Sequence, residues 1–142
     1  SDRDQRTGVV FRERVVAMEL EGRVVHTGWL DEPGDAIGVM NVLVLPSYRE
    51  GFGQVLVEAG ALGIPVVATA SRGARQAVVD GVTGLLVPPR DPRGVADALL
   101  RVAGDPALAA RLGSAAIARA RDELSQERVV RSVLSVYARV LA

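Results

Sequence analysis

The chain has 142 residues, enough for one hydrophobic core, and 49% of them are apolar. Its 17 basic and 17 acidic side chains cancel, so net charge gives no reason to expect a nucleic-acid partner. There is no cysteine and a single histidine, His26, which excludes disulfides, thiol catalysis and metal sites made of thiolates or several histidines. No apolar run is long enough to span a bilayer and no signal peptide is visible, so a cytoplasmic protein is expected.

The first forty residues carry weak signals of secondary structure. Residues 1–7 are polar and are expected to form a frayed end or a loop. Apolar residues recur at loose helical spacing over residues 9–20, which predicts a short helix that ends at Gly22. Residues 23–27 predict a short strand, and residues 35–40 predict a brief second helix.

The middle of the chain alternates strands with helices. Apolar runs at residues 42–45, 64–68 and 84–87 predict strands, and the first two are typical of strands covered on both faces of a sheet. Helices are predicted between them, at residues 54–62 and 74–79. This order indicates right-handed βαβ units and a parallel sheet. With the strand expected nearer the N-terminus there are four strands, whereas a complete doubly wound nucleotide-binding domain has about six.

No strand pattern returns after Pro89. Asp91-Pro92 and Asp105-Pro106 each combine an N-cap residue with a proline in the first turn, which predicts helices that reach about residues 103 and 122. A third helix is predicted from Ser125 onwards. Its apolar residues recur at helical spacing, so one face of this helix is expected to pack against another structure.

The loop that follows the strand at residues 42–45 is the first place to look for a ligand site. Ligands of open α/β sheets bind beyond the carboxyl ends of the strands. Gly51 and Gly53 would let the loop backbone approach a ligand closely, and the N-terminus of the next helix would offer free N–H groups to a diphosphate. Gly-x-Gly also occurs at many plain turns, so this motif alone is a weak signal.

Two glutamates flank that helix start. Glu58 lies among apolar residues of the helix, and a buried carboxylate needs a partner such as the two hydroxyls of a ribose. The alternatives are an exposed position on a mostly buried helix, or a structural pair with an arginine. Glu50 lies eight residues earlier and could accept hydrogen bonds from sugar hydroxyls. Alternatively, Glu50 serves only as a favourable negative charge near a helix N-terminus, which stabilises a helix by about 0.3–1 kcal/mol.

The ten residues from Glu50 to Ala59 resemble the E-x7-E motif of retaining glycosyltransferases with the GT-B fold, of the family four type. The resemblance extends along most of the chain, with further matches in order and at the right spacing at residues 26–31, 43–47, 63–69 and 80–89. It implies an α/β fold with a partial Rossmann-like parallel sheet and C-terminal helices. Residues 1–142 would be the C-terminal, nucleotide-sugar-binding domain without its first βαβ part and without the N-terminal acceptor domain.

The resemblance also implies a role for each matching residue. Glu50 would hold hydroxyls of the donor sugar and is the catalytic candidate, as a binding and positioning group that need not be a nucleophile. Glu58 would hold the ribose, and Leu30 would pack on the nucleobase; Trp29 could do so too, or serve in core or rim packing. His26 matches no catalytic residue of the family. The donor-binding set implied in this way is Trp29, Leu30, Asp31, Gly51, Phe52, Gly53, Gln54 and Glu58.

The implied reaction transfers a sugar from a nucleotide-sugar donor to an acceptor with retention of configuration. Positive groups and helix N-termini would stabilise the departing diphosphate, and neither a metal nor another cofactor is required. The expected partners are the nucleotide-sugar donor and the missing N-terminal domain, and no nucleic acid. The chain alone is expected to be inactive and to belong to a longer enzyme or to self-associate, and peripheral membrane contact stays open.

Three departures from the family pattern bear on this expectation. The arginine and lysine that clamp the diphosphate in relatives belong to the part that is absent here, and the chain contains no lysine. The acceptor domain is absent as well. Finally, Arg72 stands where the family usually has the first of two glycines, Gln76 stands for a glutamate, and Ala70 for an aspartate or asparagine.

Three other functions are also compatible with the sequence. The altered loop favours a non-catalytic domain that binds a nucleotide or another partner. A dinucleotide-dependent dehydrogenase would need a third glycine at the position of Leu56, so it ranks last. A related GT-B epimerase or phosphorylase also stays open.

Overall fold

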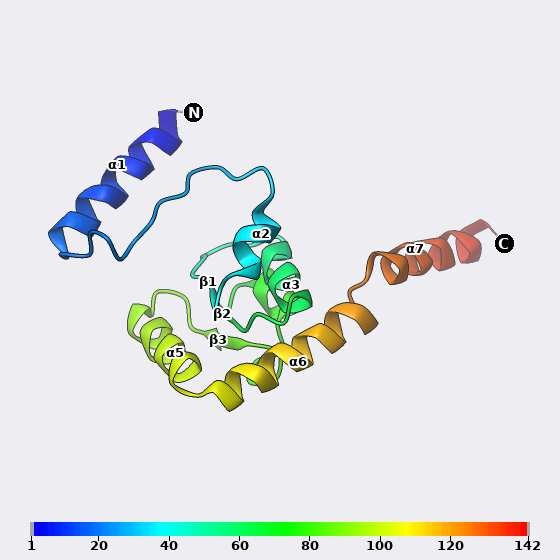
Figure 1. The fold of residues 1–142 in the computed structure, drawn as a ribbon. Helices are drawn as coiled ribbons and strands as arrows, with labels where there is room; N and C mark the ends of the chain where they lie inside the picture. The colour runs from blue at the N-terminus through cyan, green and yellow to red at the C-terminus, as the bar shows by residue number, and fades with distance from the viewer. Residues whose placement is uncertain (1, 142) are drawn as a thin grey trace. The chain divides into compact units, whose positions relative to one another are not determined.

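The computed structural model describes residues 2–141 and divides into two units, Ser1–Asp31 and Glu32–Ala142. The first unit consists of helix α1 (Asp2–Ala17) and an irregular segment (Figure 1). Within it the ring of His26 lies 5.6 Å from that of Phe11, at a tilt of 49°.

Two expectations for the first unit were wrong. Helix α1 begins at Asp2, so residues 2–7 are helical and not a loop. Residues 23–27 form no strand, and the side chain of Val25 is 83% exposed. A strand needs a neighbour to satisfy its backbone groups, and no strand pairs with this segment in the part of the chain that the structure describes.

The second unit contains a parallel sheet of three strands, one fewer than expected. Its order is β1 (Leu43–Leu45), β2 (Val66–Thr69) and β3 (Leu85–Val87). The α/β class with a small parallel sheet and C-terminal helices is confirmed. Strand β2 pairs with both neighbours, and its four residues are all buried, as its continuous apolar run predicted.

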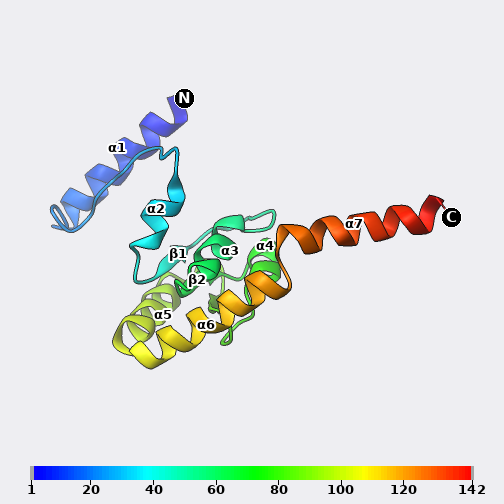
Figure 2. The same ribbon diagram turned by 45° about the vertical axis from the view of Figure 1, so that its right-hand side comes forward.

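Helices cover both faces of this sheet. One face packs against α2 (Pro33–Gly38), α3 (Gln54–Ala61) and α4 (Arg72–Ala77), with Leu56 and Ala59 of α3 buried on Val66 and Ala68. The other face packs against α5 (Pro92–Gly104) and α6 (Pro106–Asp122) (Figure 2). Adjacent residues of β2 point to opposite faces, so Val67 belongs to the second core. Both cores therefore meet at the central strand.

The N-termini of α5 and α6 follow the sequence signals closely. The carboxylate of Asp91 accepts a hydrogen bond from the N–H of Gly94 (2.8 Å), and that of Asp105 accepts one from Leu108 (2.9 Å). A proline begins each helix. Each aspartate thus satisfies an N–H group that the helix itself leaves without a partner.

Helix α6 also packs closely on the C-terminal end of α3. A Cβ built on Gly113 would clash with the carbonyl oxygen of Gly63, and one built on Gly60 would lie 3.1 Å from the Cβ of Ala116. The absence of side chains at these glycines allows the two backbones to meet. Helix α6 is thereby fixed against the helix that carries Glu58.

Helix α7 (Gln126–Leu141) follows, and none of its residues is buried. The expected packing of its apolar face is therefore not found among the described residues. None of the helices in the described part of the chain is both long enough and apolar enough to cross a membrane.

Candidate functional site

The carboxyl ends of the three strands lie at one edge of the sheet, because the strands are parallel. Hydrogen bonds join the segments that leave this edge. The hydroxyl of Thr69 donates to the carbonyl of Ser47, and the N–H of Ala70 donates to the carbonyl of Val87 at 2.8 Å. The β1–α3 loop (residues 46–53) is therefore tied to the end of β2, at the edge where ligands of such sheets bind.

The β1–α3 loop lies directly on the first turn of α4. A Cβ built on Gly73 would be 2.6 Å from the carbonyl oxygen of Glu50 and 2.8 Å from the carbonyl carbon of Gly51. Only glycine fits under this backbone, because real Cβ contacts are not that short. The loop therefore reaches its position by contact with α4 as well as by its bond to Thr69.

Gly53 connects this loop to α3 in a left-handed conformation, with φ 72° and ψ 48°. Glycine adopts this conformation without the steric penalty of other residues. No side chain caps the start of α3. The N–H of Leu56 donates to the carbonyl of Gly53 at 2.9 Å. The first N–H groups of a helix have no partner one turn earlier in the helix, so those of Gln54 and Val55 are the ones that could face an anion or a polar ligand.

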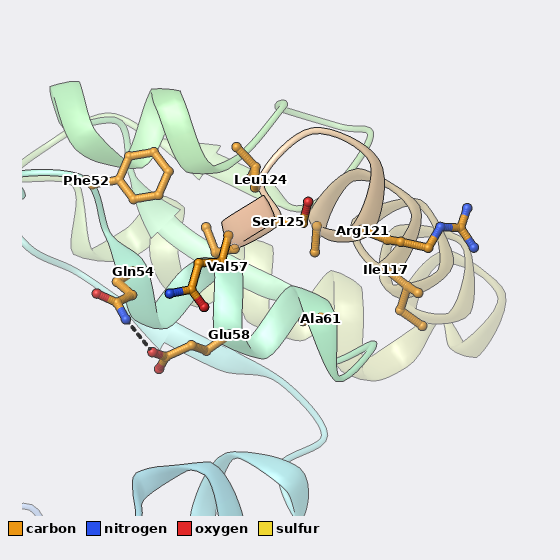
Figure 3. A pocket seen from close by; sticks show the side chains of 11 residues that line it. Phe52, Gln54, Val57, Glu58, Ala61, Ile117, Arg121, Leu124 and Ser125 are labelled. Carbon is orange, nitrogen blue, oxygen red and sulfur yellow. Dashed lines mark hydrogen bonds between the residues drawn. The ribbon is translucent and has the colours of Figure 1, made fainter. Parts of the chain in front are cut away.

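A cavity of about 660 Å³ opens beside this helix start, between α3, α6 and the segment that joins α6 to α7 (Figure 3). This volume is in the range of pockets that hold small ligands, roughly 300–1,000 Å³. Its polar wall includes Gln54, Glu58, Arg121 and Ser125, and Phe52 lies at its edge. Three of the predicted donor-binding residues, Phe52, Gln54 and Glu58, therefore line one cavity.

The expectation that Glu58 is buried was wrong. Its side chain is exposed, and one carboxylate oxygen accepts a hydrogen bond from the amide nitrogen of Gln54 at 3.0 Å (Figure 3). The helix turns this residue away from the core that holds Leu56 and Ala59, so apolar neighbours in sequence are not neighbours in space. Glu58 therefore occupies an exposed position on a mostly buried helix, as the alternative interpretation of the sequence had it, and its carboxylate is accessible to a ligand.

Glu50 is half-buried in the β1–α3 loop and does not line this cavity. Gly51 and Gly53 do not line it either. The two glutamates of the motif thus lie on different elements, Glu50 in the loop and Glu58 in the second turn of α3. An extended ligand would have to run along the start of α3 to reach both.

Trp29, Leu30 and Asp31 are the last residues of the first unit, and all three are exposed there, Trp29 at 91%. Their predicted contact with a nucleobase stays a prediction.

Arg121 is the cation on the cavity wall, and it points away from the Gln54–Glu58 pair (Figure 3). Its guanidinium donates to both oxygens of Asp122, at 2.7 and 3.1 Å. This hydrogen bonding lowers the pKa of Asp122 and raises the pKa of Arg121. In the described part of the chain no three acidic or histidine side chains come together in a way that could hold a metal ion.

Two residues near the site were missed by sequence reasoning, Gly73 and Arg119. In the sequence Gly73 is only the remaining glycine of an altered pair, whereas in the structure it contacts the β1–α3 loop, more than twenty residues away along the chain. Arg119 donates to the carbonyls of Gln76 and Ala77, both at 2.9 Å. Nothing in the spacing of an arginine on a helix surface signals a contact over forty residues away.

A family model described as "Glycosyl transferases group 1" matches residues 5–105. The chain belongs to this family. Curated relatives include the D-inositol 3-phosphate glycosyltransferase of Streptomyces bingchenggensis, 40% identical over 78% of this chain, and that of a Nocardioides species, 46% identical over 71%. This chain spans only 24% and 22% of the length of these two relatives.

Solved structures of glycosyltransferases share the fold. The sucrose-phosphate synthase of Thermosynechococcus elongatus superposes with a TM-score of 0.85 at 34% identity, over 92% of this chain and 33% of its own. HepE of Anabaena, solved in complex with UDP-glucose, superposes with a TM-score of 0.88 at 25% identity, over 94% of this chain and 37% of its own. The likeness covers almost the whole of this chain and about a third of each larger protein.

Proposed function

We propose that this chain is the donor-binding part of a glycosyltransferase that takes a sugar from a nucleoside diphosphate sugar. The observation that carries the proposal is the arrangement of the E-x7-E residues. Glu50 lies in the loop at the carboxyl edge of the sheet, and Glu58 lines a cavity next to the uncapped start of α3. The family match and a structural neighbour that holds UDP-glucose support the same ligand class.

Each part of the donor has a partner of suitable chemistry in this proposal. The N–H groups at the start of α3 and the backbone of Phe52 and Gly53 would face the diphosphate, where a helix N-terminus favours negative charge. The carboxylate of Glu58 would accept hydrogen bonds from the ribose hydroxyls, in exchange for its bond to Gln54. Glu50 would hold and orient the sugar.

The reaction proposed is transfer with retention of configuration. The protein's contribution would be to orient the sugar and stabilise the charge that develops on the departing diphosphate. No metal and no additional cofactor is part of this proposal. The acceptor would be bound by a further domain of a longer enzyme, which agrees with the short span of this chain relative to its relatives. Chemistry would take place in the cytoplasm, and the chain alone would bind donor without transferring sugar.

Isothermal titration with UDP-glucose, UDP, GDP, ADP and TDP tests the proposal on the chain as it stands. We expect one nucleotide series to bind, and Glu58→Gln to weaken that binding by about tenfold or more, since a hydrogen bond to a charged group is worth about 1.5–3 kcal/mol. The matched control is Asp97→Asn, which changes an exposed carboxylate of α5 that does not line the cavity. A folded chain that binds none of the five at millimolar concentration would contradict the proposal.

A second candidate is a non-catalytic domain that binds a nucleotide or a partner. It is favoured by Arg72 and Gln76, which replace a glycine and a glutamate of the family pattern and are both exposed on α4. Nucleotide affinity that survives Glu58→Ala would favour this alternative, because the ribose contact would then not be in use.

A further inference from the structure

We infer that Arg119 positions the β1–α3 loop by holding helix α4 beneath it. The inference rests on the proposed function, in which this loop binds the donor. Arg119 does not line the cavity beside α3, so it would be a positioning residue that acts through α4.

The side chain of Arg119 reaches from α6 to the C-terminal end of α4. Its two terminal nitrogens donate to the carbonyls of Ala77 and Gln76, both at 2.9 Å, and its Nε donates to Glu123 at 3.0 Å. The side chain of Arg119 is only 16% exposed. A guanidinium is well suited to this place, because its planar fork satisfies two helix-end carbonyls and its charge is favourable at the negative end of a helix.

Helix α4 depends on such contacts because it has only six residues. Isolated helices of this length are not stable in water, so packing and capping must hold it. Its N-terminal end is capped by the hydroxyl of Ser71, which accepts from the N–H of Ala74 at 3.2 Å. Arg119 supplies the corresponding contact at the other end.

The N-terminal turn of α4 in turn supports the β1–α3 loop. Gly73 lies so close to the backbone of Glu50 and Gly51 that a shift of α4 toward the loop would force that backbone to move. A shift away from the loop would remove its support. The position of Glu50 therefore depends on the position of α4.

Helix α6 provides a fixed base for this chain of contacts. Its Gly113 lies against the backbone of Gly63, and its Leu112 is fully buried in the second core. The same helix thus packs on the end of α3 and holds the end of α4 through Arg119. The two elements that carry Glu50 and Glu58 are positioned by one helix.

The test compares three variants of the full 142-residue chain. Arg119→Met keeps much of the side-chain length and removes the donors. Arg119→Lys keeps the charge, but a single ammonium lacks the planar fork that serves two carbonyls. The matched control is Arg111→Met, which removes another α6 guanidinium bonded to a backbone carbonyl, that of Gly81 at 3.1 Å.

Amide exchange and 15N order parameters are measured without ligand. We expect Arg119→Met to speed exchange about tenfold at the Arg75 amide of α4 and at the amide of Val78, which follows α4 and donates to the carbonyl of Ala74, and Arg119→Lys to do so by less. Order parameters of residues 50–53 should fall, while the amides of α5 keep their wild-type protection. Arg111→Met should leave both regions as in wild type. The inference would be overturned if the order parameters of residues 50–53 are unchanged in Arg119→Met. It would also be overturned if the amides of α5 lose protection as much as those of α4.

Titration with UDP-glucose then separates this inference from the proposed function. A loosened loop and weaker binding in Arg119→Met support both. A loosened loop with wild-type affinity overturns the positioning role of Arg119 and leaves the proposed function standing. A wild-type chain that does not bind contradicts the proposed function, and the order parameters still decide whether Arg119 holds the loop.

Discussion

Replacing Gly73 by alanine should destabilise the protein and disturb the β1–α3 loop together. The new Cβ would lie 2.6 Å from the carbonyl oxygen of Glu50, 2.8 Å from the carbonyl carbon of Gly51 and 2.9 Å from that of Glu50. All three are backbone atoms, so no side chain can rotate to relieve the clash. The loop or α4 must shift, and overpacking of this kind costs about 1–3 kcal/mol.

Urea unfolding followed by circular dichroism measures this cost as a loss in the free energy of unfolding. The matched control is Gly104→Ala at the end of α5, where a Cβ would meet nothing within 4 Å. Alanine is the better helix former, so the control should range from unchanged to about 1 kcal/mol more stable. A Gly73→Ala protein within about 0.5 kcal/mol of wild type, the usual range for neutral surface changes, would refute the close contact between α4 and the loop.

Three further changes test the core, a helix cap and the surface. Leu112→Ala should lower the free energy of unfolding by about 2–5 kcal/mol, because Leu112 is 0% exposed. Its control is Leu100→Ala, at a side chain that is 71% exposed, and the free energy of unfolding of this variant should lie within about 0.5 kcal/mol of wild type. Asp105→Ala should lower the free energy of unfolding by about 1 kcal/mol, since it removes the N-cap of α6. Chemical denaturation measures the effect of the core and cap substitutions. Because Arg121 lowers the pKa of Asp122, that carboxylate contributes stability above its ordinary pKa of 3.8 and loses it as the pH falls through the lowered value. This contribution is small and sensitive to salt, because both groups are exposed. We therefore expect Asp122→Asn to reduce the difference between the free energies of unfolding at neutral and acidic pH only slightly, and only at low salt.

The sequence predicted the three strands of the sheet and the starts of α5 and α6 well. It was wrong in expecting β1 to be covered on both faces, because β1 is an edge strand of the sheet and Val44 is 41% exposed. Strand β2 and the starts of α5 and α6 carry local signals, namely a continuous apolar run and an aspartate followed by proline. Residues 23–27 carried a similar apolar signal and form no strand, because pairing with a neighbour decides strand formation. Helix α7 shows the same limit, since its apolar face indicates packing and not what it packs against.

The roles of Glu50 and Glu58 stay predictions of the motif, and only the placement of the residues can be compared with the structure. The cavity brings Glu58 together with Gln54 and Phe52. The burial expected of Glu58 failed because helical geometry, and not the polarity of sequence neighbours, decides which residues face the core. Contacts between distant segments, such as Arg119 with the end of α4, have no local signal at all.

Binding of the donor at the start of α3 is tested most directly by mapping where UDP-glucose binds, from the amide NMR signals of the chain during a titration. We expect the largest shifts in residues 50–54 and in the first two turns of α3, and we expect Glu58→Gln to reduce these shifts at equal ligand concentration. Shifts that cluster on α5 and the start of α6, or binding at the predicted residues that Glu58→Gln does not change, would contradict this placement of the donor.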